Sequence, residues 1–285
     1  MIAQHAPVAR WGTQLAAWLA ALVLHLWLRS RTPVSERMAT VLAALAFLAI
    51  ASTLLAPGID GVHRWHRVGP IQLHPSALLC PALLVLAAPG LRGSSLRTQL
   101  GLVLVQLVHL AQPDAGQATA LAAGAVALLL AQEVRPAAIA LALVQVAVAA
   151  LAWLRPDPPG PMPFVEDIVV LAFTLGAPVG MLAIAALAAL VASPFLRRGQ
   201  ASTGDPMRHA SRALAAYLGA STVVHLFGEF PVPALGFGAS PVLGAFLGLT
   251  ALQRLRRGRA TDGGENPAGE RGDQRAAGCG KPTPP

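Results

Sequence analysis

Charged residues are scarce in this chain: only 12% of its 285 residues are Asp, Glu, Lys or Arg, and Lys281 is its single lysine. Soluble domains carry about 25% charged residues, so a water-soluble fold is excluded. The two cysteines, Cys80 in an apolar run and Cys279 near the end of the sequence, support neither a disulfide framework nor a structural zinc site. The net charge of +8 comes almost entirely from arginine. Membrane orientation explains this basicity better than a nucleic-acid partner, so we expect no nucleic acid.

Apolar residues make up 55% of the sequence and fall into long runs. A helix needs about 20 mainly apolar residues to cross a bilayer, because the hydrocarbon offers no water to backbone groups. We therefore predict an all-α fold for residues 1–257, a polytopic integral membrane bundle of about nine transmembrane helices. The runs span roughly 11–28, 38–56, 74–89, 98–112, 115–132, 136–154, 167–193, 213–228 and 237–253. Residues 258–285 are rich in Gly, Pro, Ala and charge, which predicts a disordered tail.

Arginine is distributed unevenly between alternate connections of this bundle. One side would carry fourteen arginines and the other only Arg10, Arg64, Arg67 and Arg155. Because cytoplasmic loops are enriched in Lys and Arg, the count predicts a cytoplasmic C-terminal tail and an N-terminus outside. Six of the acids of this bundle, at 60, 114, 157, 166, 167 and 229, would then lie on the outer side, in four separate connections, as an extracytoplasmic polar site would require.

The first outer connection contains Arg64-Trp65-His66-Arg67, two arginines three residues apart around a tryptophan. Arginine makes bidentate contacts with phosphate, and tryptophan favours the headgroup level of a bilayer. A lipid phosphate is therefore a natural ligand. A tryptophan anchor with snorkelling arginines explains the same residues equally well.

Two later outer connections place acids at the start of apolar helices. Asp114 precedes the fifth run and has Gln117 three residues on, which is typical of an N-terminal helix cap. Glu166 and Asp167 follow a loop with five prolines in nine residues, and this stiff loop holds them near the membrane surface. A partly buried carboxylate there could act as a general base, although acids in a first helical turn are also ordinary partners of the helix dipole.

The last outer connection, residues 228–241, combines prolines and glycines before the ninth run. Irregular backbone at membrane depth is tolerated only where protein buries it or where it lines a cavity. The segment therefore indicates either a re-entrant wall of a site or a simple tight turn.

Together these segments resemble the SEDS family, the FtsW and RodA proteins of bacterial cell division and elongation. The family's Arg-Trp-Ile-Arg-Leu-Gly-Pro and Gln-Pro-Ser-Glu are similar to residues 64–70 and 74–77. Its Gln-Pro-Asp-x-Gly is similar to residues 112–116, and its Thr-Asp-Phe-Ile-Phe to residues 166–170. Its Pro-Leu-Pro-Phe-Val-Ser-Tyr-Gly-Gly-Ser is similar to residues 231–240. The four matches occur in the family's order, within about residues 38–256.

The resemblance implies a peptidoglycan glycosyltransferase of the bacterial inner membrane that acts on lipid II, the undecaprenyl-diphosphate-linked disaccharide. It places the family's essential acid on Asp167, as base toward the acceptor hydroxyl. Arg64 and Arg67, with or without a divalent cation, would stabilise the departing diphosphate. Asp114 and Ser240 would complete the substrate site. The expected partners are membrane lipids and a class B penicillin-binding protein, which supplies crosslinking.

Departures from the family pattern keep a second hypothesis open. Ala77 stands where the family has glutamate, no predicted helix contains lysine, and the nine predicted helices lack a counterpart of the first of the family's ten. A non-catalytic SEDS-like protein that binds a lipid-linked precursor, or scaffolds cell-wall synthesis proteins, fits these departures. A transporter or a metal site is a weaker third alternative. Its only indication is the scattered histidines at 63, 66, 74, 109 and 225, which lack the spacing of metal ligands.

Overall fold

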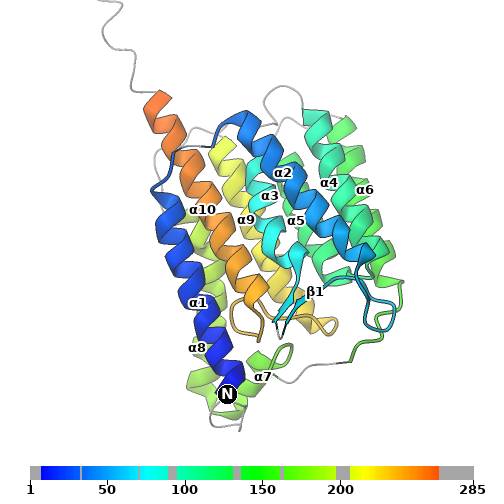
Figure 1. Ribbon diagram of the computed structural model, residues 1–285, viewed down its shortest axis with the longest axis vertical. Coiled ribbons are helices and arrows are strands. Elements are labelled where there is room, and N and C mark those ends of the chain that lie inside the picture. Colours follow the sequence, from blue (N-terminus) through cyan, green and yellow to red (C-terminus); the bar gives the residue numbers. More distant parts are fainter. Residues whose placement is uncertain are drawn as a thin grey trace, which may run out of the picture.

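The computed structural model describes residues 8–32, 34–69, 71–88, 95–130, 136–160, 164–196 and 206–262, which form a helical bundle (Figure 1). Its ten α-helices within these ranges are α1 (Val8–Arg29), α2 (Glu36–Ala51), α3 (Pro75–Ala87), α4 (Ser95–Ala111), α5 (Ala115–Leu130), α6 (Pro136–Trp153), α7 (Ile168–Thr174), α8 (Ala177–Ala192), α9 (Pro206–Val223) and α10 (Ala239–Asp262). Short 3₁₀ turns follow α2, α8 and α9 at η2 (Ser52–Leu55), η4 (Ser193–Phe195) and η5 (Val224–Leu226). The predicted all-α fold is confirmed.

One small hairpin interrupts the helices. Strand β1 (His66–Val68) pairs antiparallel with β2 (Ile71–Leu73), so that Arg67 lies opposite Gln72. The hairpin lies in the long connection between α2 and α3, at the lower end of the bundle in Figure 1. It therefore adds a polar segment to one end of the molecule and leaves the helical packing undisturbed.

The outer helices expose apolar side chains, as a bilayer requires. Within the described residues, four helical stretches are long and apolar enough to cross a membrane: Trp11–Arg29, Glu36–Leu55, Pro136–Trp153 and Ala177–Phe195. Leu45 on α2 and Leu182 on α8 are 55% and 70% exposed. Soluble monomers rarely expose large apolar surfaces of this kind. The number of nine crossings stays a prediction.

The inner helices α3, α5, α9 and α10 form the main core, where Leu84, Leu121, Leu214 and Leu252 are buried together. Two of these helices approach closely because α10 has a glycine at the contact. A Cβ at Gly244 would overlap the carbonyl oxygen of Ala77 on α3. Small residues allow such backbone contact between membrane helices.

The predicted long helix over 167–193 is wrong, because the structure divides it into α7 and α8. The break is at Gly176, whose φ of 132° favours glycine, and Pro178 follows in the first turn of α8. Two other boundaries also move. Helix α9 begins at Pro206 instead of residue 213, and α10 continues to Asp262, nine residues past the end of the predicted run at 253. The remainder of the predicted tail, 263–285, lies outside the described residues.

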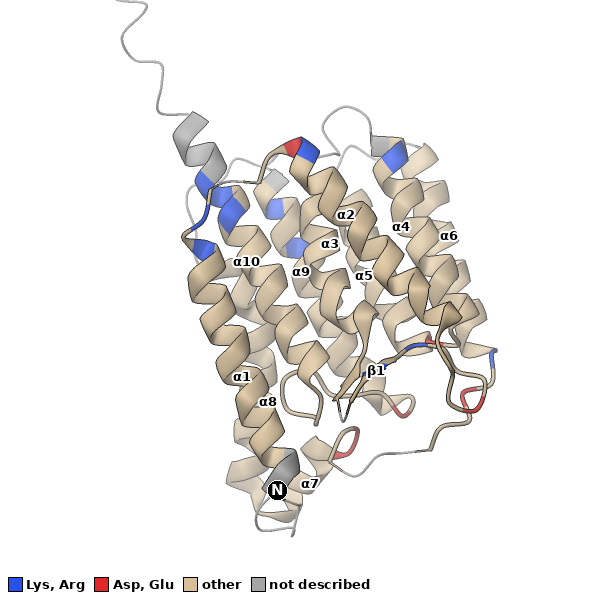
Figure 2. Ribbon diagram, viewed as in Figure 1, with Lys and Arg blue, Asp and Glu red and all other residues tan. Residues whose placement is uncertain are grey.

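Figure 2 shows most Lys and Arg at the upper end of the bundle and most Asp and Glu at the lower end, where a few Lys or Arg also lie. At the upper end, the basic end, Arg29 ends α1, and Arg37, Arg97 and Arg208 lie in the first turns of α2, α4 and α9, with Glu36 beginning α2. Arg254 of α10 lies there too, since it donates to the Thr32 carbonyl just after α1. The lower end, the acid end, has the connections that contain Asp60, Asp157, Glu166, Asp167 and Glu229. The expectation that polar segments distant in sequence would meet at one end is confirmed for the described residues.

Candidate functional site

A cavity of about 420 Å³ opens at the acid end of the bundle. Four connections contribute to its wall, together with the second turn of α1, the first turns of α5 and α10, and parts of α3 and α9. Its charged and polar lining includes Arg64, His74, Asp114, Glu166, Glu229 and Ser240. The remaining wall is largely apolar and contains Trp65 and Phe230. A mostly apolar pocket with a few convergent polar groups is the usual form of a ligand site.

Arg64 is the cation of this cavity and is only 5% exposed. Its terminal nitrogens donate to both carboxylate oxygens of Asp157, at 2.9 and 2.8 Å, and the carboxylate of Asp114 lies 3.9 Å away. The guanidinium also lies over the ring of Trp65, 4.4 Å from its centroid. These contacts compensate the buried positive charge and fix the plane of the guanidinium.

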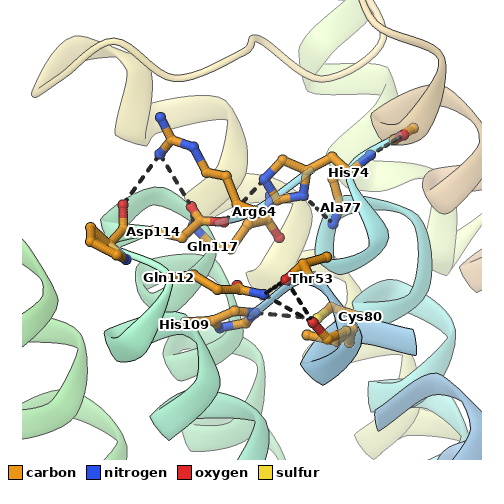
Figure 3. A network of polar contacts seen from close by, with 12 residues as sticks. Thr53, Arg64, His74, Ala77, Cys80, His109, Gln112, Asp114 and Gln117 are labelled. Atoms are coloured by element: carbon orange, nitrogen blue, oxygen red, sulfur yellow. Dashed lines mark hydrogen bonds and ion pairs between the residues drawn. The ribbon is translucent and has the colours of Figure 1, made fainter. Parts of the chain in front are cut away.

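Asp114 connects Arg64 to His74, as Figure 3 shows. His74 Nε2 lies 3.0 Å from the second carboxylate oxygen of Asp114. Burial by itself would raise the pKa of Asp114, but His74, Arg64 and His109 outweigh it and hold the pKa well below its ordinary value. The cavity floor therefore keeps an ionised carboxylate between two basic groups.

The predicted helix cap at Asp114 is present, since its carboxylate accepts a hydrogen bond of 3.1 Å from the backbone N–H of Gln117. The side chain of Gln117 does not return to the cap. Its amide oxygen accepts a 2.6 Å hydrogen bond from the hydroxyl of Tyr217 on α9. Asp114 is thus held by its own helix and by neighbouring side chains.

Ser240 links the start of α10 to the start of α3. Its hydroxyl oxygen accepts a 2.9 Å hydrogen bond from the backbone N–H of His74. The His74 ring in turn accepts from the backbone N–H of Ala77, which caps α3. The first turn of α10 is therefore fastened to the start of α3, directly beside Asp114.

The irregular segment 230–238 is the opposite wall, and backbone contacts hold it to the residues before α7. Val232 N–H donates to the Val165 carbonyl at 3.3 Å, and Phe237 N–H donates to that of Phe164 at 2.9 Å. A Cβ at Gly236 would overlap the Val165 carbonyl oxygen, so glycine permits this approach. Of the two predicted forms of this segment, a wall of a cavity is the one observed.

Gln14 on α1 satisfies several backbone groups of the same wall. Its amide nitrogen donates to the carbonyls of Ala234 and Gly236, at 3.3 and 3.1 Å, and its amide oxygen accepts from Gly238 N–H at 3.0 Å. The indole of Trp18 also donates to Ala234, at 3.2 Å. Helix α1 therefore supplies partners that an irregular segment at this depth would otherwise lack.

The five predicted site residues divide into two groups. Arg64, Asp114 and Ser240 line the cavity, whereas Arg67 and Asp167 are exposed and lie outside its lining. Arg67 is separated from Arg64 because it lies in β1, next to His66, whose ring bonds the Ser52 hydroxyl at 2.9 Å. Arg64 precedes β1 and is buried against Asp157, whereas the side chain of Arg67 is exposed.

Asp167 is the residue before α7, and its side chain makes no capping hydrogen bond. The preceding residue, Glu166, is buried in the cavity wall. Sequence reasoning did not single out Gln14 or the pairing of Asp157 with Arg64. Gln14 could have been found as a lone glutamine in an apolar helix. Nothing in the sequence indicated which acid Arg64 would bind.

The donor set does not fit a divalent cation held by the protein. Across the described ranges, no three His, Cys, Asp or Glu side chains gather as metal ligands. The two carboxylates nearest Arg64 already face Arg64 and His74. We therefore derive no step from a metal ion.

Comparisons with known proteins agree with this architecture. The solved structure of the rod shape determining protein RodA from Thermus thermophilus superimposes with a TM-score of 0.68, at 21% identity over 90% of each chain. A mutant of that RodA gives the same TM-score at 20% identity. A chain from a peptidoglycan synthase complex, described as coordinating polymerization and crosslinking, gives 0.63 at 20% identity, over 87% of this chain and 90% of that one. Identities this low show the fold alone.

Among curated proteins, none matches the chain. The sequence model of the FtsW, RodA and SpoVE family, described as cell cycle protein, matches residues 3–165. That range is more than half of the 285 residues. The chain belongs to this family, the SEDS family of multi-pass bacterial membrane proteins.

Proposed function

We propose that the chain is a peptidoglycan glycosyltransferase that polymerises lipid II at the acid-end cavity. The observation that carries the proposal is the buried guanidinium of Arg64 in a cavity of about 420 Å³, lined by Asp114 and Ser240. A buried arginine fits a diphosphate through paired hydrogen bonds. Family membership supports the sugar-lipid substrate.

In the proposed reaction, Asp167 removes the proton from the acceptor sugar hydroxyl, and the resulting oxygen attacks the anomeric carbon of the donor. The bond from that carbon to the diphosphate oxygen breaks, and undecaprenyl diphosphate leaves. Arg64 stabilises the charge on the leaving group. Exposure of Asp167 before α7 leaves its carboxylate open to the sugar hydroxyl of an acceptor outside the cavity.

The remaining site residues position or attract the substrate in this proposal. Asp114 and Ser240 fix His74 and Arg64 around the diphosphate. Arg67, exposed on the hairpin, attracts the anionic headgroup before it enters the cavity. Asp157 competes with the diphosphate for Arg64, because it accepts one hydrogen bond from each terminal nitrogen.

We infer that the acid end faces outward and that the C-terminus is cytoplasmic. The clustering of arginine at the basic end supports this orientation (Figure 2). Asp60→Cys should react with a membrane-impermeant maleimide on intact cells, and Arg37→Cys should not. The reverse pattern would overturn the orientation. A class B penicillin-binding protein is the proposed partner, since the chain resembles one from a synthase complex.

Binding without polymerisation is the second candidate function. Two observations favour it: Asp157 already occupies Arg64, and Ala77 lies in the cavity wall where the family has glutamate. A scaffold would hold the lipid-linked precursor, or cell-wall synthesis proteins, without a working base. The scaffold and the glycosyltransferase would use the same cavity, and one assay distinguishes them.

That assay is polymerisation of lipid II by the purified protein, alone and with candidate class B penicillin-binding proteins. Glycan strands from the wild type support the glycosyltransferase. Precursor binding without strands under every pairing supports the scaffold. Absence of both binding and strands contradicts both candidates.

A further inference from the structure

A second hollow lies on the outside of the bundle, near the acid end. It is a groove of about 540 Å³. Its lining consists of Thr119 of α5, Trp153 of α6, Ala220 and Val223 of α9, Val224 of η5, and Phe227 directly after η5. Val223 and Phe227 are 48% and 71% exposed, so the groove opens on the surface that faces lipid. Thr119 is about one turn inside the start of α5, which places the groove just below the cavity.

The groove offers no free polar group. The indole N–H of Trp153 donates to the hydroxyl oxygen of Thr119 at 2.9 Å, and that hydroxyl donates to the Ala115 carbonyl at 2.8 Å. The other four lining residues are apolar. A surface whose polar atoms are already paired favours a hydrocarbon ligand, because a polar ligand would lose its hydrogen bonds to water.

The groove and the cavity share a wall. Val224 lines both hollows, and Phe230, which lines the cavity, packs edge-on against Trp153 with ring centroids 5.4 Å apart. Glycines make room for the Phe230 ring, since a Cβ at Gly116 would overlap it. The Trp153–Phe230 pair therefore lies between the two hollows, with Trp153 lining the groove and Phe230 lining the cavity.

We propose that the groove binds the isoprenoid chain of the lipid-linked substrate, with Trp153 and Phe230 at the passage between groove and cavity. This inference rests on the proposed function, because it assigns the second part of the same ligand. A polyprenyl diphosphate is polar at one end and hydrocarbon at the other. The molecule places a buried arginine in one hollow and a fully apolar lining in the adjoining one.

Photocrosslinking tests the assignment directly. Undecaprenyl diphosphate with a photoreactive group on its isoprenoid chain is added to the full chain in phosphatidylcholine vesicles. We expect crosslinks on residues 220–227, and we expect unlabelled undecaprenyl diphosphate to remove them. Crosslinks spread evenly over the other lipid-facing helices would overturn the proposal. So would groove crosslinks that a photoreactive phosphatidylcholine forms equally and undecaprenyl diphosphate does not displace.

A matched pair of variants tests the groove itself. Ala220→Phe fills it, whereas Leu226→Phe adds the same ring at a residue that is 69% exposed and outside the lining. Crosslinking should fall about tenfold in the first variant and stay unchanged in the second. Equal yields in both variants contradict the proposal. If Ala220→Phe fails to fold, the competition experiment on the wild type still decides.

The outcomes also separate this inference from the proposed function. Glycan strands without displaceable groove crosslinks would remove the groove assignment and leave the polymerase. Displaceable crosslinks without strands would keep the groove and remove the polymerase. The two proposals can therefore fail independently.

Discussion

Gln14 and Gly238, 224 residues apart, share a 3.0 Å hydrogen bond between the Gln14 amide oxygen and the Gly238 backbone N–H. Together with two carbonyls bound by its amide nitrogen, Gln14 ties α1 to the irregular wall of the cavity. The same wall is fastened to the carbonyls of Phe164 and Val165, just before Glu166 and Asp167. The first helix therefore fixes the position of the proposed base without contacting it.

Replacing Gln14 should weaken both the fold and the site. Gln14→Leu leaves buried backbone groups of the 234–238 segment without partners, which costs about 1–3 kcal/mol of unfolding free energy. Leu15→Ala on the same helix removes an exposed side chain and is the control. Unfolding in detergent measures both. Equal midpoints for Gln14→Leu and the wild type would show that the wall does not depend on α1.

Glycines at two helix positions should respond in opposite ways to alanine. At Gly244 the added Cβ overlaps the Ala77 carbonyl oxygen, and overpacking of this kind costs about 1–3 kcal/mol. At Gly101 nothing lies within 4 Å of the added atom, so alanine should stabilise α4 by about 0.5–1 kcal/mol. Thermal midpoints of the two variants test the close approach of α3 and α10. Similar shifts in both would refute it.

Removal of the Asp157 charge should free Arg64 for anions. In Asp157→Asn the guanidinium loses its bidentate partner, so inorganic pyrophosphate should bind several-fold more tightly. Asp60→Asn removes the same charge from the same end, at an exposed residue outside the cavity lining, and should leave the affinity unchanged. Calorimetric titration distinguishes the two. Unchanged affinity in Asp157→Asn would mean that Arg64 is structural.

Acid should remove the stabilisation that Asp114 provides. The fold lowers the pKa of Asp114 below its ordinary value of 3.8, so the ionised form stabilises the folded state. This contribution is complete above 3.8 and is lost as the pH falls through the lower folded value. The difference in stability between wild type and Asp114→Asn should be constant at higher pH and shrink below 3.8. A difference that persists unchanged in strong acid would contradict the ion pairs.

Hydropathy alone predicted most of the fold, because each apolar run had to become a helix in a bilayer. The same runs hid the break at Gly176, since α7 and α8 are both apolar and only the glycine and Pro178 mark the boundary. The charge count predicted which connections share an end. It could not predict that Arg64 binds Asp157, because the two are 93 residues apart and meet only after packing.

The same limit applies to the candidate site. The family motifs grouped Arg64, Asp114 and Ser240 into one site, and these three residues line one cavity. The motifs also treated Arg64 and Arg67 as equivalent. The structure separates them, because Arg64 precedes β1 and is buried against Asp157, whereas Arg67 lies in β1 and is exposed. For Glu166 and Asp167, adjacency in sequence left open which carboxylate the cavity wall would bury, and the wall buries Glu166.

Polymerisation of lipid II by Asp167→Asn and Glu166→Gln, each beside the wild type and with its penicillin-binding partner, tests the central claim most directly. Loss of the base should slow strand formation at least about a hundredfold in Asp167→Asn, and Glu166→Gln should retain strand formation, because in our account it lines the cavity without accepting the proton. Wild-type rates in Asp167→Asn would contradict Asp167 as the base. Loss of strands in Glu166→Gln alone would move the chemistry to the buried carboxylate.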